Sequence, residues 1–128
     1  MGPVFWLYSF LGATGAAIVA TLVTGKKGLR RVHLASVITM TALLLVTLHF
    51  AKESGKVLDF PADRHDVHMP LARTAFYSLL GPLVTGALHW YGKVGKRVHS
   101  MAVAVFLIAL TAALGTGAWM MMGATAKV

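Results

Sequence analysis

Four of the six histidines in this chain lie at the ends of long apolar segments. His33 and His49 bracket one such segment, His68 directly precedes a second, and His99 opens a third. An imidazole changes charge near neutral pH and is a common metal ligand. Within a membrane segment it needs a polar partner or a metal, because ionisable groups are costly there. These four side chains are therefore the candidate functional residues.

The tripeptide RVH occurs twice, at residues 31–33 and at residues 97–99. Both copies open apolar segments that leave the same side of the membrane, so His33 and His99 are expected at the same depth. We predict that these two histidines face each other and are the axial ligands of a haem b iron. Arg31 and Arg97 are expected to pair with the anionic haem propionates. The alternative is that both histidines are polar groups at the headgroup level, without a cofactor.

A second ligand pair is predicted near the opposite surface, formed by His49 and His68. Arg73 lies about one turn into the segment after His68 and would pair with the propionates of a second haem b, because a bare arginine in a membrane helix is costly. On an ideal helix, His33 and His49 would be separated by about 24 Å along the axis and by about 160° around it, so the two side chains leave opposite faces. The alternative for His68 is a loop histidine.

The two remaining histidines are expected to have other roles. His89 is a competing ligand for His33 or His99. Its neighbour Trp90 is typical of the membrane–water interface, which favours an interfacial role for His89. His65 is expected to lie in a loop.

The elements that must position these residues are four apolar segments, at residues 4–24, 32–51, 69–91 and 98–122. Each has about the 20 residues that a helix needs to cross a hydrocarbon core of about 30 Å. The chain is 57% hydrophobic and only 12% of its residues are charged, against about 25% in a typical soluble domain. We therefore predict an all-α fold, an integral membrane four-helix bundle that forms a single domain over residues 1–128.

The composition also excludes several classes of site. The chain has no cysteine, which excludes disulfides, thiolate zinc sites, iron–sulfur clusters and covalently attached c-type haem. Its net charge of +8 does not indicate a nucleic-acid partner, because the basic residues form short clusters between apolar segments, where they orient a membrane protein. No acidic residue lies within the four segments, which argues against a proton-coupled drug transporter.

Two basic clusters predict the orientation of the chain. One lies between the first and second segments and the other between the third and fourth, and together they contain Lys26, Lys27, Arg30, Arg31, Lys93, Lys96 and Arg97. Cytoplasmic loops are enriched in such residues. We therefore predict a multi-pass protein of the bacterial inner membrane, surrounded by lipid. Both termini and the acidic loop at residues 52–67 are expected on the non-cytoplasmic side.

The chain also contains an internal repeat. YSFLG at residues 8–12 matches YSLLG at residues 77–81, and an RVH tripeptide follows each of them. The predicted bundle is therefore built from a duplicated two-helix hairpin. Each half crosses the membrane twice, so the halves should be related by a pseudo-two-fold axis along the membrane normal. The repeat does not include the other ligand pair, because the repeat mate of His49 is Gly115.

Proline and glycine are expected to shape the helices. Pro70 is expected in a first helical turn, which is a favoured position, and Pro82 is expected to kink the third segment by removing a backbone hydrogen bond. Glycines within the segments let membrane helices approach closely and can also make room for a flat macrocycle. These glycines are Gly12, Gly15, Gly81, Gly86, Gly115 and Gly117.

Four short stretches carry a resemblance to a known class of membrane protein. RRVH, TLHFA, HMPLA and KRVH, which contain His33, His49, His68 and His99, resemble the ligand regions of small four-helix di-haem b-type cytochromes. That class includes ferric-reductase-like proteins and bacterial cytochrome b membrane subunits. The order of the histidines is also similar to a family of small membrane proteins associated with cytochrome oxidase assembly. The spacing between His33 and His49 is longer than the usual cytochrome pattern and departs from it.

The resemblance implies transmembrane electron transfer, in which haem carries the redox chemistry and the protein supplies the ligands. The implied partners are a quinone or a periplasmic donor, and the subunits of a larger redox complex. The loops are too short for a catalytic domain, so an electron-carrying subunit of an oxidoreductase is expected and not a complete enzyme. One alternative is an assembly factor that binds haem or copper for a terminal oxidase. Another is a structural membrane subunit without a cofactor.

Overall fold

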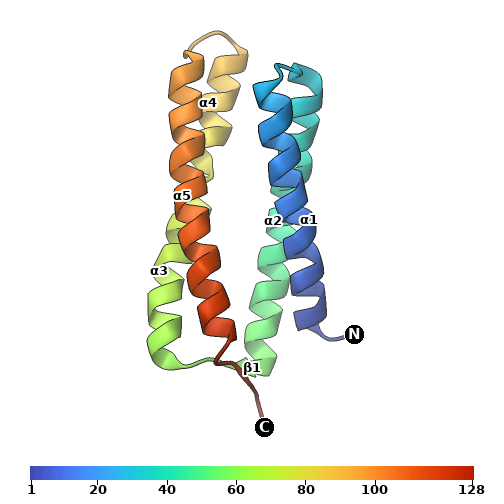
Figure 1. Cartoon of the computed structure of the whole chain (residues 1–128), viewed down its shortest axis with the longest axis vertical. Coiled ribbons are helices and arrows are strands. Elements are labelled where there is room, and N and C mark those ends of the chain that lie inside the picture. The colour runs from blue at the N-terminus through green and yellow to red at the C-terminus, as the bar shows by residue number, and fades with distance from the viewer. The chain divides into compact units, whose positions relative to one another are not determined.

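The computed structural model describes all 128 residues and consists almost entirely of helices. In chain order the elements are α1 (Pro3–Lys26), α2 (Arg30–Val57), β1 (Leu58–Asp59), α3 (Ala62–Ser78), α4 (Leu80–Trp90), α5 (Lys96–Met121) and β2 (Thr125–Ala126); Figure 1 labels all of them except β2. The chain forms two compact units. The first contains Met1–Asp59 and Ala126–Val128, and the second contains Phe60–Thr125.

The first unit is a hairpin of α1 and α2 (Figure 1). The chain turns at Gly28, whose φ of 71° lies in the left-handed region that glycine adopts without strain. Far from this turn along the helices, the rings of Phe10 and Phe50 stack with their centroids 5.4 Å apart. Trp6 packs against Phe50 at a centroid distance of 6.2 Å. These aromatic contacts hold the open end of the hairpin together.

A buried polar pair joins α1 to α2 between these two ends. Thr14 Oγ1 and Thr47 Oγ1 are 2.9 Å apart, and the two residues are only 2% and 5% exposed. Each hydroxyl also lies within hydrogen-bond distance of the carbonyl four residues earlier in its own helix. Neither oxygen is therefore buried without a partner, which is the condition for placing polar side chains between membrane helices.

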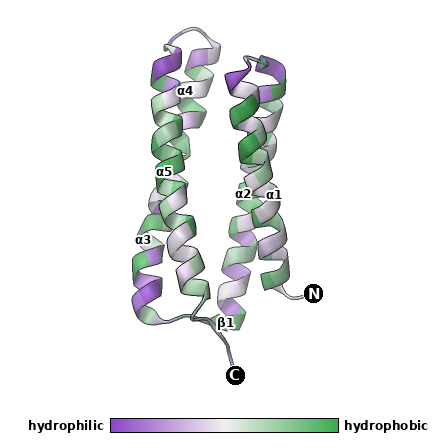
Figure 2. Ribbon diagram, in the orientation of Figure 1, coloured by the Kyte–Doolittle hydropathy of each residue, from purple (hydrophilic) through white to green (hydrophobic).

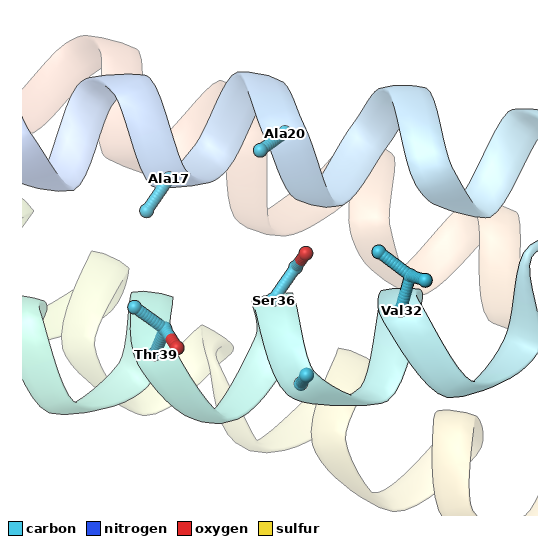
Figure 3. Close-up of a pocket in the computed structure, with 6 residues that line it drawn as sticks. Ala17, Ala20, Val32, Ser36 and Thr39 are labelled. Atoms are coloured by element: carbon cyan, nitrogen blue, oxygen red, sulfur yellow. The ribbon is translucent and has the colours of Figure 1, made fainter.

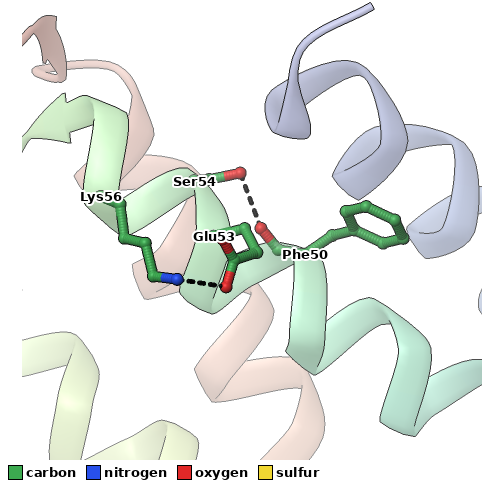
Figure 4. A network of polar contacts seen from close by, with 4 residues as sticks. All are labelled: Phe50, Glu53, Ser54 and Lys56. Carbon is green, nitrogen blue, oxygen red and sulfur yellow. Dashed lines mark hydrogen bonds and ion pairs between the residues drawn. The ribbon is translucent and has the colours of Figure 1, made fainter.

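α2 continues well beyond the last residue of the predicted apolar segment and ends at Val57. Two local contacts accompany this extension (Figure 4). Lys56 Nζ lies 2.6 Å from Glu53 Oε1, and the buried Ser54 hydroxyl donates a hydrogen bond to the Phe50 carbonyl at 2.8 Å. An ion pair three residues apart on a helix supports it by a few tenths of a kcal/mol. α2 is therefore longer than the predicted apolar segment.

The second unit packs α3 and α4 against α5. Its buried apolar residues are Ala75 and Leu79 on the α3–α4 side and Phe106, Ala113 and Met120 on α5. Two of these are alanines, whose small side chains let the helix backbones come close together. The core of the unit therefore lies along one face of α5.

Arg64 joins the first turn of α3 to the last turns of α5. Its Nη1 donates a hydrogen bond to the Trp119 carbonyl at 2.9 Å, and its guanidinium carbon lies 5.1 Å from the centroid of the Trp119 ring. This distance is typical of a cation–π contact. Arg64 also passes close to Gly123, because a Cβ built there would lie 2.9 Å from Nη1. The end of α5 is therefore held by one side chain of α3.

The third predicted segment, residues 69–91, is interrupted. α3 ends at Ser78 and α4 begins at Leu80, with a break at Leu79. Pro82 has no N–H to pair with the carbonyl four residues earlier, that of Ser78, and this missing bond accounts for the break. The kink predicted from Pro82 therefore appears as a break in the helix, about one turn before the proline.

Two predictions about the start of this segment were wrong. Pro70 was expected in a first helical turn, but α3 begins at Ala62 and contains Pro70 in its interior. The acidic loop was expected at residues 52–67, but only residues 58–61 lie between α2 and α3. Polar and charged side chains can occupy helix ends that project beyond an apolar segment. Hydropathy therefore locates the apolar segment but not the ends of the helix.

The C-terminal residues are hydrogen-bonded to the end of α2. β1 and β2 form a two-stranded sheet, and the Lys127 N–H donates to the Val57 carbonyl at 3.1 Å. Lys127 Nζ donates to the Gly55 carbonyl at 2.9 Å and lies 3.8 Å from Asp59 Oδ1. That ion pair is exposed and contributes little to stability. The backbone bonds are therefore the main attachment of the C-terminus.

Three helices, α1, α2 and α5, are long and apolar enough to cross a membrane. At most 17% of their most apolar stretches is buried inside the structure. Figure 2 shows apolar residues along these helices and hydrophilic residues gathered near helix ends. α3 and α4, with 17 and 11 residues, are each too short to meet the same criterion. An apolar exterior of this extent is typical of contact with membrane lipid.

Candidate functional site

His33, in the first turn of α2, packs onto the last turns of α1. Its Nδ1 lies 2.9 Å from the Thr21 carbonyl oxygen and 3.4 Å from Thr24 Oγ1. A Cβ built on Gly25 would lie only 2.9 Å from Cε1 of the imidazole. The half-buried ring therefore rests directly on the backbone of α1, at a position that requires glycine.

His99, in the first turn of α5, packs onto α4 in the same manner. Its Nδ1 lies 3.1 Å from Thr85 Oγ1, and a Cβ built on Gly86 would lie 3.1 Å from Cε1 of the ring. The His89 ring lies alongside, parallel to within 5° and with its centroid 6.2 Å away. His89 Nδ1 is 2.9 Å from the Val94 carbonyl oxygen. The structure therefore places His89, expected at the membrane interface, next to His99.

His68 packs onto α5 from α3. Its Nδ1 lies 3.2 Å from Thr116 Oγ1, and a Cβ built on Gly117 would lie 3.1 Å from Cε1. Burial lowers the pKa of His68, because desolvation penalises the imidazolium more than the neutral ring. His68 is therefore a helix residue and not a loop residue. His65, which was expected in a loop, also belongs to α3 and is exposed.

These three histidines share one structural environment. Each imidazole lies on a Thr–Gly dipeptide of a neighbouring helix, with the glycine under Cε1 and the threonine beside Nδ1. We call this arrangement a threonine–glycine seat. The three seats are Thr24–Gly25 for His33, Thr85–Gly86 for His99 and Thr116–Gly117 for His68.

The dipeptide occurs once more, at Thr14–Gly15, without a histidine. A Cβ built on Gly15 would meet nothing within 4 Å, and Thr14 is bonded to Thr47 instead. The sequence predicted close helix packing at the glycines but not their contact with imidazoles. The recurring Thr–Gly dipeptide is the signal that could have revealed the seats, although it needs the fold to show which copies face a histidine.

The hydrogen bonds define which nitrogen of His33 and His99 carries the proton. A carbonyl oxygen only accepts, so Nδ1 of His33 donates to the Thr21 carbonyl. Thr85 Oγ1 donates its single hydrogen to the Gly81 carbonyl at 2.7 Å. It must therefore accept a hydrogen from Nδ1 of His99. In the neutral form, both imidazoles then carry their lone pair on Nε2.

The same argument applies to His68. Thr116 Oγ1 donates to the Ala112 carbonyl at 2.8 Å, so it accepts a hydrogen from Nδ1 of His68. Nε2 is thus the nitrogen with the lone pair here too. Metal-ligating histidines commonly have this arrangement, in which one nitrogen donates to an oxygen and the other binds the metal.

His49, the remaining predicted ligand, has a different environment. It is exposed on α2, and its ring meets the Phe50 ring edge-on with centroids 5.3 Å apart. No hydrogen bond within the chain holds its imidazole. The three arginines expected to serve haem propionates, Arg31, Arg73 and Arg97, are exposed as well.

Each predicted ligand pair takes one histidine from each unit. His33 and His49 belong to the first unit, and His68 and His99 belong to the second. Their pairing around a common iron therefore stays a prediction. No group of three or more His, Cys, Asp or Glu side chains could hold a metal ion. A haem iron takes only two axial side chains, so the haem prediction does not require such a group.

A shallow groove lies between α1 and α2 in the first unit (Figure 3). Its lining side chains are small or uncharged, and none is titratable near neutral pH. They are Ala17, Ala20, Val32, Ala35, Ser36 and Thr39. Figure 3 shows the alanines of α1 facing the groove from the side opposite Ser36. The groove is a packing surface and not a candidate catalytic site.

Comparison of the chain with protein-family models, curated proteins and solved structures finds no match. The resemblance to di-haem cytochromes therefore rests on the histidine-containing stretches alone. The function is inferred from the environment of these histidines.

Proposed function

We propose that the chain is a membrane electron-transfer subunit that binds b-type haem through paired histidines. One observation carries this proposal. In three of the four predicted ligands, His33, His68 and His99, Nδ1–H donates to an oxygen on a neighbouring helix. The neutral ring then presents the Nε2 lone pair, which is the form that ligates iron.

The residues of the first ligand pair fit a haem. His33 and His99 would hold the iron, and the exposed Arg31 and Arg97 would pair with the propionates. Haem supplies one-electron redox chemistry when bound, and the chain supplies ligation, burial and orientation. The two basic loops near these histidines support the proposed cytoplasmic side of this site.

The second site has a less complete set of contacts. His68 has a threonine–glycine seat, and Arg73 follows it by about one turn and a half of α3. His49 has no hydrogen bond to fix its ring. We propose that a second haem b binds here, with His68 as its better-oriented ligand.

Two features support the proposed duplication and its place in the membrane. In each unit an RVH histidine at the start of one helix rests on a Thr–Gly dipeptide of the preceding helix. Each of these helix connections also carries a basic cluster. We propose two like-oriented hairpins in the bacterial inner membrane, with both termini outside the cytoplasm. The partners would be a quinone or periplasmic donor and the subunits of a larger redox complex.

A structural subunit without a cofactor is the second candidate. It is favoured by the observation that each seated histidine already joins two helices within its own unit. Interhelical hydrogen bonds between polar side chains in membranes contribute about 0.6 to 2 kcal/mol each. In this case the histidines would stabilise the hairpins and ligate nothing.

The decisive experiment is the haem content of the purified full chain and of matched variants. His99→Ala should abolish the haem bound between His33 and His99, whereas the exposed His65→Ala should bind as much haem as wild type. A wild-type chain without haem, whose unfolding temperature nevertheless falls with His99→Ala, would favour the structural subunit. Recovery of copper in place of haem would favour the assembly factor.

The orientation has its own test, because the chain contains no cysteine. Single cysteines at Gly2 and at Val94 can be labelled with a membrane-impermeant thiol reagent in intact cells. We expect labelling at Gly2 and none at Val94. The reverse pattern would contradict the proposed orientation without bearing on haem binding.

A further inference from the structure

We propose that the groove between α1 and α2 binds one acyl chain of an anionic phospholipid, whose phosphate group is held by Lys27 and Arg31 at the turn of the hairpin. The partner is thus an individual lipid of defined charge, beyond the general contact of the apolar helices with membrane lipid. The inference uses the first unit alone and does not depend on haem.

The groove extends along the hairpin from a level next to the turn. On the α2 side, Figure 3 shows Val32, Ser36 and Thr39 in order along the helix. α2 begins two residues before Val32, and Thr39 lies about 10 Å further along the axis. The groove holds about 210 Å³, less than the about 300 to 1,000 Å³ of typical small-molecule pockets. A slender, extended chain therefore fits it better than a compact ligand.

Two basic residues lie at the end of the groove that is nearest the turn. Lys27 follows the groove residue Ala20 by seven residues, and its backbone is still helical, with φ −75° and ψ −5°. It therefore lies about two turns beyond Ala20 on the same face of α1. Arg31 precedes the groove residue Ala35 by four residues, which places it about one turn nearer the start of α2. Both basic side chains are exposed, so a phosphate at this level can contact a base from each helix.

Neither of these two bases has an anionic partner within the chain. The ion pairs of the structure involve other basic residues. Glu53, the only acidic residue of α2, lies about 33 Å from Arg31 along the helix axis, and charges this far apart are screened at physiological ionic strength. The positive charge at the turn is therefore balanced from outside the chain. A lipid phosphate suits lysine and arginine, and its acyl chain extends in the direction of the groove.

The test is native mass spectrometry of the full chain in detergent, titrated separately with phosphatidylglycerol and with phosphatidylethanolamine of identical acyl chains. Wild type should retain one phosphatidylglycerol in preference to phosphatidylethanolamine by about thirtyfold, which corresponds to about 1 kcal/mol for each of two bases near an anionic surface. Lys27→Gln should lower this preference to about fivefold. Lys27 is the residue to change, because Arg31 is also proposed to pair with a haem propionate.

Matched variants separate a defined site from diffuse attraction. Ala20→Leu fills the groove without changing the charge and should weaken the retention of both lipids. Ala16→Leu, at another exposed position of α1 outside the groove, should retain both as wild type does. Lys93→Gln removes the same charge from the second unit and should keep the preference for phosphatidylglycerol.

Three results would overturn the inference. The first is a wild-type chain without any preference for phosphatidylglycerol. The second is an equal loss of preference in Lys27→Gln and Lys93→Gln, which would mean that the basic clusters attract anionic lipid without a site. The third is an Ala20→Leu chain that retains both lipids as wild type does but no longer associates with a second copy of itself, which would make the groove a protein interface.

Discussion

Replacement of Gly86 by alanine perturbs the seat of His99 with a single methyl group. The new Cβ would lie 3.1 Å from Cε1 of the imidazole, and ordinary van der Waals contact begins at 3.4 Å. The ring must therefore retreat by a few tenths of an ångström, which stretches or bends the 3.1 Å contact with Thr85. At Gly25 the corresponding distance to His33 is 2.9 Å, so the required shift is larger there.

Two opposing energies decide the outcome. Alanine in a helix interior is favoured over glycine by about 1 kcal/mol, whereas overpacking a closely packed site costs about 1 to 3 kcal/mol. Gly86→Ala should therefore range from neutral to about 2 kcal/mol destabilising. Gly15→Ala is the matched control, because it alters the fourth Thr–Gly dipeptide at a position where the new Cβ meets nothing within 4 Å. It should retain the full helix-propensity gain.

The assay is thermal unfolding in detergent together with haem content. Gly15→Ala should unfold at the wild-type temperature or above, and it should bind haem as wild type does. Gly86→Ala should be less stable than this control by about 1 to 3 kcal/mol, the overpacking cost alone, and should lose haem. Equal stability and equal haem content of the two variants would refute the close contact between ring and backbone.

Three further substitutions test the packing of the two units. Thr47→Ala should cost about 1 kcal/mol in thermal unfolding, because it leaves Thr14 without its partner across the helix pair; an unchanged midpoint would contradict this. Pro82→Ala should restore a donor for the Ser78 carbonyl and raise amide-exchange protection between α3 and α4, and unaltered protection would show that the proline does not cause the break. Arg64→Ala should lower the stability of the second unit by about 1 to 2 kcal/mol through loss of its hydrogen bond and its cation–π contact with α5, and unaffected unfolding would mean that neither holds the helix end.

The apolar segments located the helices but not their ends. α1 and α5 nearly match their predicted ranges, because each has short polar flanks at a turn. α2 and α3 extend into charged sequence, where the contact of Lys56 with Glu53 supports a helix that hydropathy does not indicate. The sequence predicted a kink from Pro82 without giving its position. The break lies at Leu79, upstream of the proline, because the lost bond involves the carbonyl four residues before it.

The sequence identified histidines that the structure places in hydrogen bonds to a neighbouring helix. It did not identify the threonines and glycines that these imidazoles contact. His33 and His99 were selected by their repeated tripeptide, and both prove to rest on a glycine. The seats themselves could not be predicted, because Thr24 and Thr85 precede their histidines by different numbers of residues. Which Thr–Gly dipeptide faces an imidazole depends on helix register, and the unoccupied copy at Thr14 shows that the dipeptide alone does not decide it.

The most direct test of the account is the electron spin resonance spectrum of the oxidised, purified full chain, measured with the haem-to-polypeptide ratio. The account predicts at least one b-type haem per chain with a low-spin signal of bis-imidazole ligation. That signal should be lost in both His33→Ala and His99→Ala and kept in His65→Ala, with any second haem affected only by changes at His49 or His68. A chain that folds without haem, or haem that persists unchanged in both the His33 and His99 variants, would contradict the account.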